Sequence, residues 1–215
     1  MNEKMTIHKA LAELKLLDGR IEKATGDAVF VAANKHSNTV IGGVQVLEFA
    51  GQAKDALRSI QTLISRRNAI KRAVTRSNAV TMVSIGGKEY TVAEAIDMKN
   101  LGMEHLKYLC SVIETQYAGA KAKAERENGE KLEQRADTYI QSLYQNADKK
   151  NISEEVRKMR DDFITSQTIE ILDPVSAVKT AAALHEEIDA FMADVDSALS
   201  VSNALTTIDI SYDTY

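Results

Sequence analysis

The chain has 215 residues, a hydrophobic fraction of 44%, a charged fraction of 27% and a formal net charge of −4. These values are typical of a soluble folded protein, and the surplus of acidic residues excludes general nucleic-acid binding, which needs a basic face. A single Pro, no Trp and 5% aromatic residues favour helices that pack through aliphatic side chains. No apolar run approaches ~20 residues, so we expect no membrane span.

The first quarter of the chain predicts two helices separated by a β-prone region. Apolar residues at steps of three and four predict a helix over residues 5–24, and Gly26 ends it. Residues 28–46 hold two short β-prone runs around a polar tip, which indicates a second, irregular β-hairpin or an ordered loop. A long helix is predicted to follow over residues 47–78.

The centre of the chain predicts a tight β-hairpin over residues 81–91. Gly86 and Gly87 lie between two β-prone runs, and both can take a positive φ at little cost because they lack a Cβ atom. Thr91 is then placed to cap the next helix, and Glu94, three residues later, completes a capping box.

The second half predicts further helices and a short final strand. A long helix is expected over 92–145, with a bend near Gly129, followed by a break at 148–151 and a helix over 153–166. Asp173 as N-cap and Pro174 at the first helical position predict a last helix over 174–203. The tail alternates apolar and polar residues, and we expect it to add a strand to one of the hairpins.

The predicted fold class is mostly α. The helices over 47–78 and 92–145 are expected to form a long antiparallel helical hairpin, or coiled-coil-like bundle, within one elongated helical domain spanning 1–215. The central β-hairpin and the second small hairpin or loop accompany these helices. Long helices with Leu, Ala and Met stripes usually bury those stripes against partners, so we expect a homo-oligomer.

The sequence shows no catalytic constellation, and we expect no enzyme, no cofactor and no metal. The single cysteine, Cys110, adjoins an apolar stripe and is expected to be a small core residue in a reducing, intracellular compartment. The polar start of the chain lacks the apolar region of a signal peptide. No histidine pair has helical metal-ligand spacing, and the Gly-Gly pairs lack the other residues of nucleotide-binding loops.

Five cations crowd the end of the predicted helix over 47–78. At ~100° per residue, Arg67, Lys71 and Asn78 fall within its apolar face, and the other cations point elsewhere. A buried cation needs a partner, because an unpaired buried charge destabilises the fold by several kcal/mol. The five cations are Arg66, Arg67, Lys71, Arg72 and Arg76.

Two interpretations of this cluster stay open. The cations pair internally with acids at the start of the returning helix, namely Glu94, Asp97 or Glu104. Alternatively, Arg67, Lys71, Arg76 and Asn78 line a pocket for an anionic ligand such as a nucleotide or cyclic dinucleotide. A neighbouring subunit would complete that pocket.

Two stretches of the chain resemble the family of bacterial and phage helical-hairpin proteins that carries the label septicolysin. The first stretch begins with Ser77–Thr81 and continues through the Gly-centred turn into Tyr90–Ile96, which leads into a helix with Lys99. The family shows a similar order: an Asn-Ala-x-Thr segment, a Gly turn and a Leu-Thr-x-Ala-Leu helix start. The turn here is two residues longer than the family's. The label implies a lytic toxin, but the chain has no secretion signal and no aromatic-rich insertion hairpin.

The second stretch is the end of the last helix. It matches the family's Asp-x-x-Ile-x-x-x-Asn-x-x-Thr ending at Asp196, Leu199, Asn203 and Thr206. It departs from the family at Ala204, where the family has Trp. Together the two stretches cover about half of the chain. The whole length is similar to hypothetical proteins from phages and prophages of Gram-positive bacteria.

These observations predict a non-catalytic, phage-encoded oligomeric binding or assembly protein. Its expected partners are further copies of itself and other phage proteins, and its expected location is the host bacterial cytoplasm or the virion. The alternative is a phage anti-defence protein that sequesters an anionic nucleotide immune signal in a basic pocket at a subunit interface.

Overall fold

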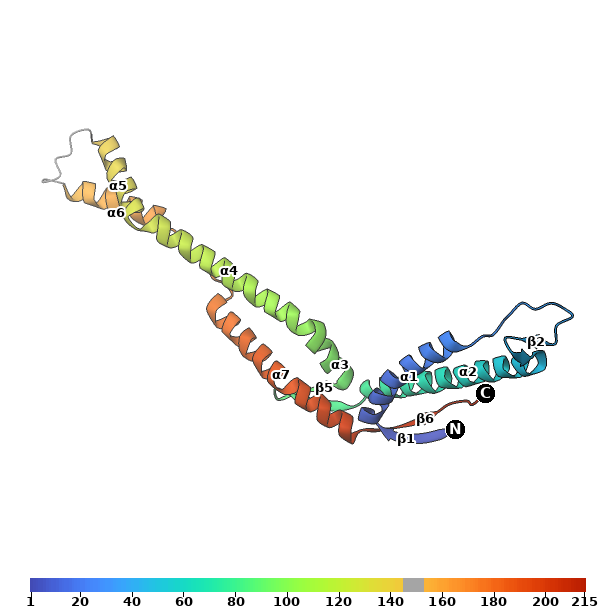
Figure 1. Ribbon diagram of the computed structural model, residues 1–215. Coiled ribbons are helices and arrows are strands. Elements are labelled where there is room, and N and C mark those ends of the chain that lie inside the picture. Colours follow the sequence, from blue (N-terminus) through green and yellow to red (C-terminus); the bar gives the residue numbers. More distant parts are fainter. Residues whose placement is uncertain (145–152) are drawn as a thin grey trace. The chain divides into compact units, whose positions relative to one another are not determined.

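The computed structural model describes residues 1–144 and 153–215, and its contacts divide the chain into two compact units. Unit 1 comprises residues 1–101 and 190–215, and unit 2 comprises residues 102–189 (Figure 1). The single domain over 1–215 stays a prediction. The expected break at 148–151 lies outside the described residues.

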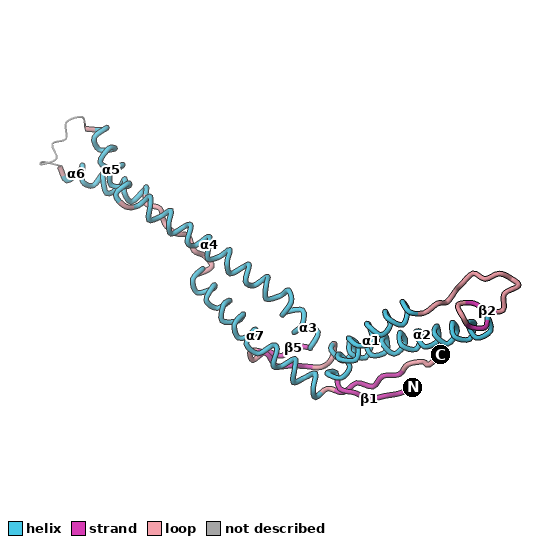
Figure 2. The backbone as a smooth tube through the Cα atoms, viewed as in Figure 1, coloured by secondary structure: helices cyan, strands magenta, loops and turns pink. Residues whose placement is uncertain are grey.

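The described chain is mostly helical with small two-stranded antiparallel sheets, which confirms the predicted fold class (Figure 2). The helices are α1 (Ile7–Asp27), α2 (Val46–Asn78), α3 (Val92–Asp97), α4 (Met103–Asn128), α5 (Glu130–Leu143), α6 (Glu154–Gln167) and α7 (Ala177–Leu205). The strands are β1 (Asn2–Thr6), β2 (Val40–Ile41), β3 (Val44–Gln45), β4 (Met82–Ile85), β5 (Lys88–Thr91) and β6 (Thr207–Ser211). No described helix has the combination of length and apolar character that crossing a membrane requires.

In unit 1 the tail of the chain pairs with its start. Strand β6 runs antiparallel to β1, with Met5 opposite Ile208. The prediction that the tail joins one of the hairpins was wrong, because residues 2–6 form a strand rather than the approach to a helix. The side chain of Thr6 then caps α1 by accepting a hydrogen bond from the Lys9 backbone N–H at 3.2 Å.

The main core of unit 1 lies between α1, α2 and this sheet. Strand β6 alternates buried and exposed residues, so Ile208 and Ile210 face the helices. Helix α2 packs along α1, whereas the sequence pattern predicts that it pairs with the helix that begins at residue 92. That pairing was wrong, because the apolar faces of α1 and β6 cover the buried face of α2. The buried members of this core are Met5, Ile7, Ala10, Leu17, Ala69, Ile70, Val74, Ile208, Ile210 and Tyr212.

One arginine at the edge of this core joins four segments of unit 1. Arg66 on α2 donates hydrogen bonds to Glu13 on α1, to Glu3 on β1 at 2.8 Å and to the Tyr212 hydroxyl at 2.7 Å. The Arg66 side chain is only 18% exposed. Because both carboxylates hold it, the pKa of the guanidinium is raised, and it remains charged at all accessible pH.

The central hairpin forms as predicted. Gly86 and Gly87 occupy the turn with φ values of +56° and +76°. Thr91 caps α3 in a capping box with Glu94, whose carboxylate accepts the Thr91 backbone N–H at 2.7 Å. The hairpin also contacts the last part of α7, where the Tyr90 and Phe191 rings meet edge to face with centroids 5.6 Å apart.

The other predicted hairpin is shorter than expected. Only residues 40–41 and 44–45 pair, around Gly42 and Gly43 with φ values of +56° and +87°. Residues 28–31 form no strand.

The helix expected over 92–145 is interrupted twice. A π-helical segment (Met98–Gly102) separates α3 from α4. At Gly129 the backbone leaves the helical region, with ψ of −139°, so α4 ends and α5 begins. The bend expected near Gly129 is therefore a complete break.

The last helix begins three residues later than predicted. The Asp173 carboxylate caps it by accepting the Ala177 backbone N–H at 2.9 Å. Pro174 precedes the helix instead of opening it, because Ser176 takes a left-handed conformation with φ of +52°.

Unit 2 is built on a seven-residue repeat. Residues 103, 110, 117 and 124 of α4 are buried or half-buried, as expected for a coiled-coil seam. The seam packs on the start of α7, where the Cys110 thiol donates to the Ala181 carbonyl at 3.6 Å. Helices α5 and α6 pack together through the stacked rings of Tyr139 and Phe163, with centroids 4.6 Å apart.

We predict that Arg66→Met destabilises unit 1. The substitution keeps the aliphatic stem but leaves Glu3 and Glu13 near the core without their cation. The expected loss is about 2–3 kcal/mol, or roughly 5–10 °C in Tm. Thermal unfolding followed by circular dichroism measures this loss of stability. The control is Arg72→Met, because Arg72 is exposed and has no ion-pair partner among residues 1–144 and 153–215. Equal melting temperatures for the two variants would contradict the account.

The same interaction predicts acid sensitivity. The hydrogen bond from Arg66 holds the pKa of Glu3 below its ordinary value in the folded protein. Its stabilising contribution is therefore complete above the unfolded pKa of about 4.3 and disappears as pH falls through the lower folded-state pKa. Urea denaturation should show Glu3→Gln less stable than the wild type at neutral pH, with the difference shrinking in acid.

The control for this experiment is Glu22→Gln, because Glu22 lies exposed on α1. It should unfold like the wild type at both pH values. A difference between Glu3→Gln and the wild type that stays constant down to strong acid would show that the Glu3–Arg66 pair does not contribute.

Candidate functional site

The structure distributes the predicted anion-binding residues over different environments. Arg67 donates to the Asp18 carboxylate of α1 at 2.7 Å. The prediction that it pairs with Glu94, Asp97 or Glu104 was wrong, because α2 packs along α1. Asn78 is half-buried at the last residue of α2.

The prediction that Lys71 lies within the apolar face of α2, and that Arg66 points elsewhere, was wrong. The inward cation is Arg66, and Lys71 is exposed. Arg66, Ile70 and Val74 are spaced at i, i+4 and i+8, so they share the face that packs on α1 and β6. Lys71 follows Ile70 and is turned away from the core by ~100°.

Three exposed cations on α2 form what we call the basic strip: Lys71, Arg72 and Arg76. None of their side chains has a hydrogen-bond or ion-pair partner in the described parts of the chain. Arg72 lies between two open grooves of about 630 Å³ each, one shared with Lys71 and the other with Arg76. Each groove also contains a carboxylate, Asp213 in the first and Asp209 in the second, so the strip is only partly electropositive.

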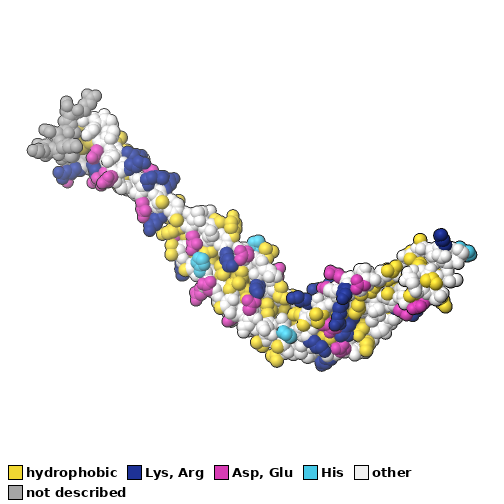
Figure 3. Space-filling view, viewed as in Figure 1, with side chains coloured by type: hydrophobic (Ala, Val, Ile, Leu, Met, Phe, Trp, Pro, Cys, Tyr) yellow, Lys and Arg dark blue, Asp and Glu magenta, His cyan; other side chains and the backbone are white. Residues whose placement is uncertain are grey.

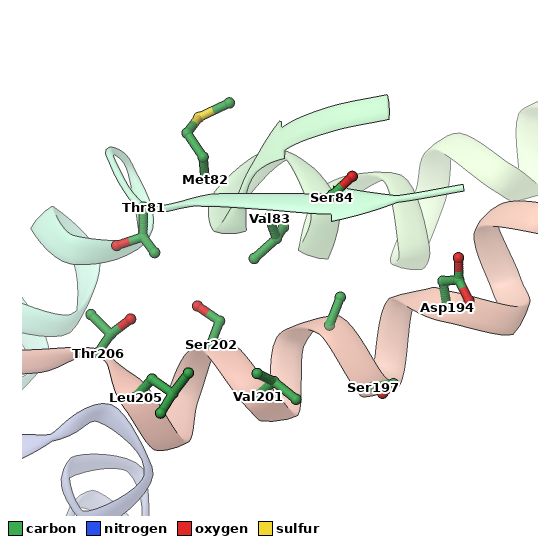
Figure 4. A pocket seen from close by; sticks show the side chains of 11 residues that line it. Thr81, Met82, Val83, Ser84, Asp194, Ser197, Val201, Ser202, Leu205 and Thr206 are labelled. Atoms are coloured by element: carbon green, nitrogen blue, oxygen red, sulfur yellow. The ribbon is translucent and has the colours of Figure 1, made fainter. Parts of the chain in front are cut away.

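A second surface of unit 1 was not predicted from the sequence. An open groove of about 530 Å³ runs between β4 and the last part of α7, and we call it the α7 groove (Figure 4). Figure 4 shows Val83 of β4 pointing toward the helix, while Met82 points to the other side of the strand. The groove is lined by Thr81, Met82, Val83, Ser84, Asp194, Ser197, Ala198, Val201, Ser202, Leu205 and Thr206.

The helical wall of the α7 groove carries small and aliphatic side chains. Ala198, Val201 and Leu205 follow one another at steps of three and four, so they form one continuous stripe. Leu205 is 76% exposed and Val201 is half exposed. In contrast, Val195 on the same helix is buried within unit 1.

The single charged residue of the groove is already engaged. Asp194 accepts a hydrogen bond from the Gly86 backbone N–H at 3.2 Å. A Cβ at Gly86 would lie 3.4 Å from the Ala190 backbone, which shows how closely the turn approaches α7. The groove is therefore lined by apolar and hydroxyl-bearing side chains, and its one carboxylate, that of Asp194, is hydrogen-bonded to the Gly86 backbone.

One signal in the sequence marks this surface. The three-and-four spacing of α7 continues beyond its last buried residues to Leu205, so the stripe is longer than the part covered within the unit. The strand that forms the opposite wall could not be located from this pattern.

Unit 2 contains a group of side chains that can share a metal ion. Cys110, Glu114 and His185 each bring one ligand atom to within 4.8 Å of the others. No sequence pattern indicates this group, because His185 lies 71 residues from Glu114. It is the one such group among residues 1–144 and 153–215.

No protein-family model, curated protein or solved structure matches the chain. The geometry of these surfaces is therefore the basis for a functional proposal.

Proposed function

We propose that this protein is a non-catalytic binding protein that assembles with copies of itself through the α7 groove. The phage-like resemblance of the chain supports a role in phage assembly or in the virion. The observation that carries the proposal is the exposed stripe that ends at Leu205, which lies beside a strand and is covered by no other segment in the described part of unit 1.

The exposed apolar area supplies the driving force. Burying a Val or Leu side chain fully contributes about 1.5–3 kcal/mol relative to leaving it in water. Val201 and Leu205 are adjacent on one helix face, so a single partner can cover both. Figure 3 shows hydrophobic side chains interspersed with charged ones on the viewed face of both units.

The chemistry of the groove favours a second copy of the same chain as its occupant. The lining has no cation, and its one acid, Asp194, is hydrogen-bonded within the unit. Asp194 lies eleven residues before Leu205 on α7, so a two-fold axis near Val201 and Leu205 keeps the two Asp194 carboxylates apart. The small side chain of Ala198 allows the two helices to approach closely.

We predict that Leu205→Lys prevents self-association. A lysine at the C-terminal end of a helix is favourable for the helix dipole, so the fold should be retained, but its charge opposes burial in an apolar interface. Sedimentation velocity at micromolar concentration should show an oligomer for the wild type and a smaller species for Leu205→Lys.

The matched control is Leu47→Glu. Leu47 is as exposed as Leu205 but lies at the start of α2, where an acid is favourable for the dipole. This variant should sediment like the wild type. A wild type that is monomeric, or a Leu205→Lys variant that associates normally, would refute the proposal.

A second candidate function is the binding of an anionic nucleotide on the basic strip, as in the anti-defence hypothesis. It is favoured by three neighbouring cations without partners in the described chain. Compared with the site predicted from the sequence, the basic strip lacks Arg67 and Asn78 and includes Arg72. Asp209 and Asp213 oppose it, because each would lie close to the bound phosphate. A neighbouring subunit would have to contribute the remaining contacts.

This candidate predicts that Arg72→Ala weakens nucleotide binding more than any other single change, because Arg72 borders both grooves. A charge-assisted contact is worth about 1.5–3 kcal/mol, or roughly ten- to a hundredfold in affinity. Calorimetric titration with a cyclic dinucleotide measures it, and the Tm should be unchanged because Arg72 is exposed. Arg58→Ala, on the same helix outside both grooves, is the control. No heat of binding with the wild type would remove this candidate.

A further inference from the structure

Three side chains of different chemistry converge on one side of the α4–α7 seam in unit 2. His185 Nε2 lies 3.0 Å from Glu114 Oε1, and the Cys110 Sγ lies within 4.8 Å of both ligand atoms. Glu114 and His185 are half exposed, whereas Cys110 is fully buried. The group therefore has one ligand inside the seam and two at its solvent edge.

The helices themselves fix this arrangement. Cys110 and Glu114 are four residues apart on α4, so they lie on one face of the helix, one turn apart. Ala181 and His185 have the same spacing on α7. The Cys110 thiol contacts the Ala181 carbonyl at 3.6 Å, and α7 runs antiparallel to α4 (Figure 1). Because each side chain leans toward the N-terminus of its own helix, Glu114 reaches back toward Cys110 and His185 toward Ala181, so the two meet.

We propose that Cys110, Glu114 and His185 form a binding site for Zn²⁺ or a similar divalent transition-metal ion. A thiolate, an imidazole and a carboxylate are the three ligand types that Zn²⁺ takes in proteins. Three protein ligands leave the fourth tetrahedral position for water, which can reach the ion from the exposed side of the pair. The neutral imidazole and the carboxylate bind without losing a proton, and the Cys110 S–H bond breaks to form the S–Zn bond, releasing H⁺ to solvent.

A bound divalent cation would change the electrostatic environment of the Cys110 thiol. Burial and the nearby Glu114 carboxylate raise the pKa of the Cys110 thiol, so the metal-free thiol is protonated and unreactive at neutral pH. A divalent cation between the thiol and the carboxylate reverses both effects, because its charge stabilises the thiolate and neutralises the repulsion. Bound metal would also join α4 to α7 and stabilise unit 2.

The test uses the full chain after treatment with a chelator and removal of the chelator. Calorimetric titration with ZnCl₂ should show one site per chain, and the Tm should rise with added Zn²⁺. Co²⁺ should give a tetrahedral visible spectrum with a thiolate-to-metal charge-transfer band. The band identifies Cys110 directly, because the chain has no other cysteine.

The variants are His185→Ala, Glu114→Gln and Cys110→Ala. Loss of a direct ligand should weaken Zn²⁺ binding by more than about 100-fold, because even changes behind the ligands cost about 10–100-fold. The matched control is His105→Ala, an exposed histidine on the same helix, which should bind Zn²⁺ like the wild type. If Cys110→Ala does not fold, His185→Ala and Glu114→Gln decide alone, because both side chains are exposed.

Two results would overturn the proposal. One is the absence of Zn²⁺ binding to the wild type, which would leave Cys110 as a core residue beside an exposed His–Glu pair. The other is equal Zn²⁺ binding by the wild type and His185→Ala, or a Co²⁺ complex without the charge-transfer band, which would place the ion elsewhere.

Discussion

Unit 1 depends on a cation placed at the edge of an apolar core. Arg66 contacts partners 53, 63 and 146 residues away in sequence, and each belongs to a different segment. An isolated charge in that position would destabilise the fold, whereas two carboxylates and a hydroxyl satisfy its donors. The interaction therefore selects one register of α2 against α1 and ties both ends of the chain to the same helix.

This register also determines which parts of α2 and α7 remain available to partners. With Arg66, Ile70 and Val74 turned inward, Lys71 and Arg72 must face solvent. Strand β6 begins two residues after α7 ends, so its pairing with β1 fixes the end of that helix. The stripe that reaches Leu205 consequently stays uncovered within the unit.

Local features could be predicted from the sequence, and contacts between distant segments could not. The Gly86–Gly87 turn and the Thr91–Glu94 capping box depend on neighbouring residues, and both are present as predicted. The β1–β6 pairing joins segments about 200 residues apart, and no short-range pattern indicates it. The surroundings of the candidate residues depend on the same long-range contacts. The packing of α2 on α1 and β6 turns Arg66 inward and leaves Lys71 exposed, and the partner of Cys110 and Glu114 lies on another helix.

The most direct test of the central claim, that a second copy covers the α7 groove, is hydroxyl-radical footprinting of the wild type at dilute and concentrated conditions. The account predicts that the reactivity of Leu205 falls as the protein associates, while that of Leu47, which is also largely exposed, does not change. An associated protein in which Leu205 reacts as fast as in the dilute sample would contradict the account.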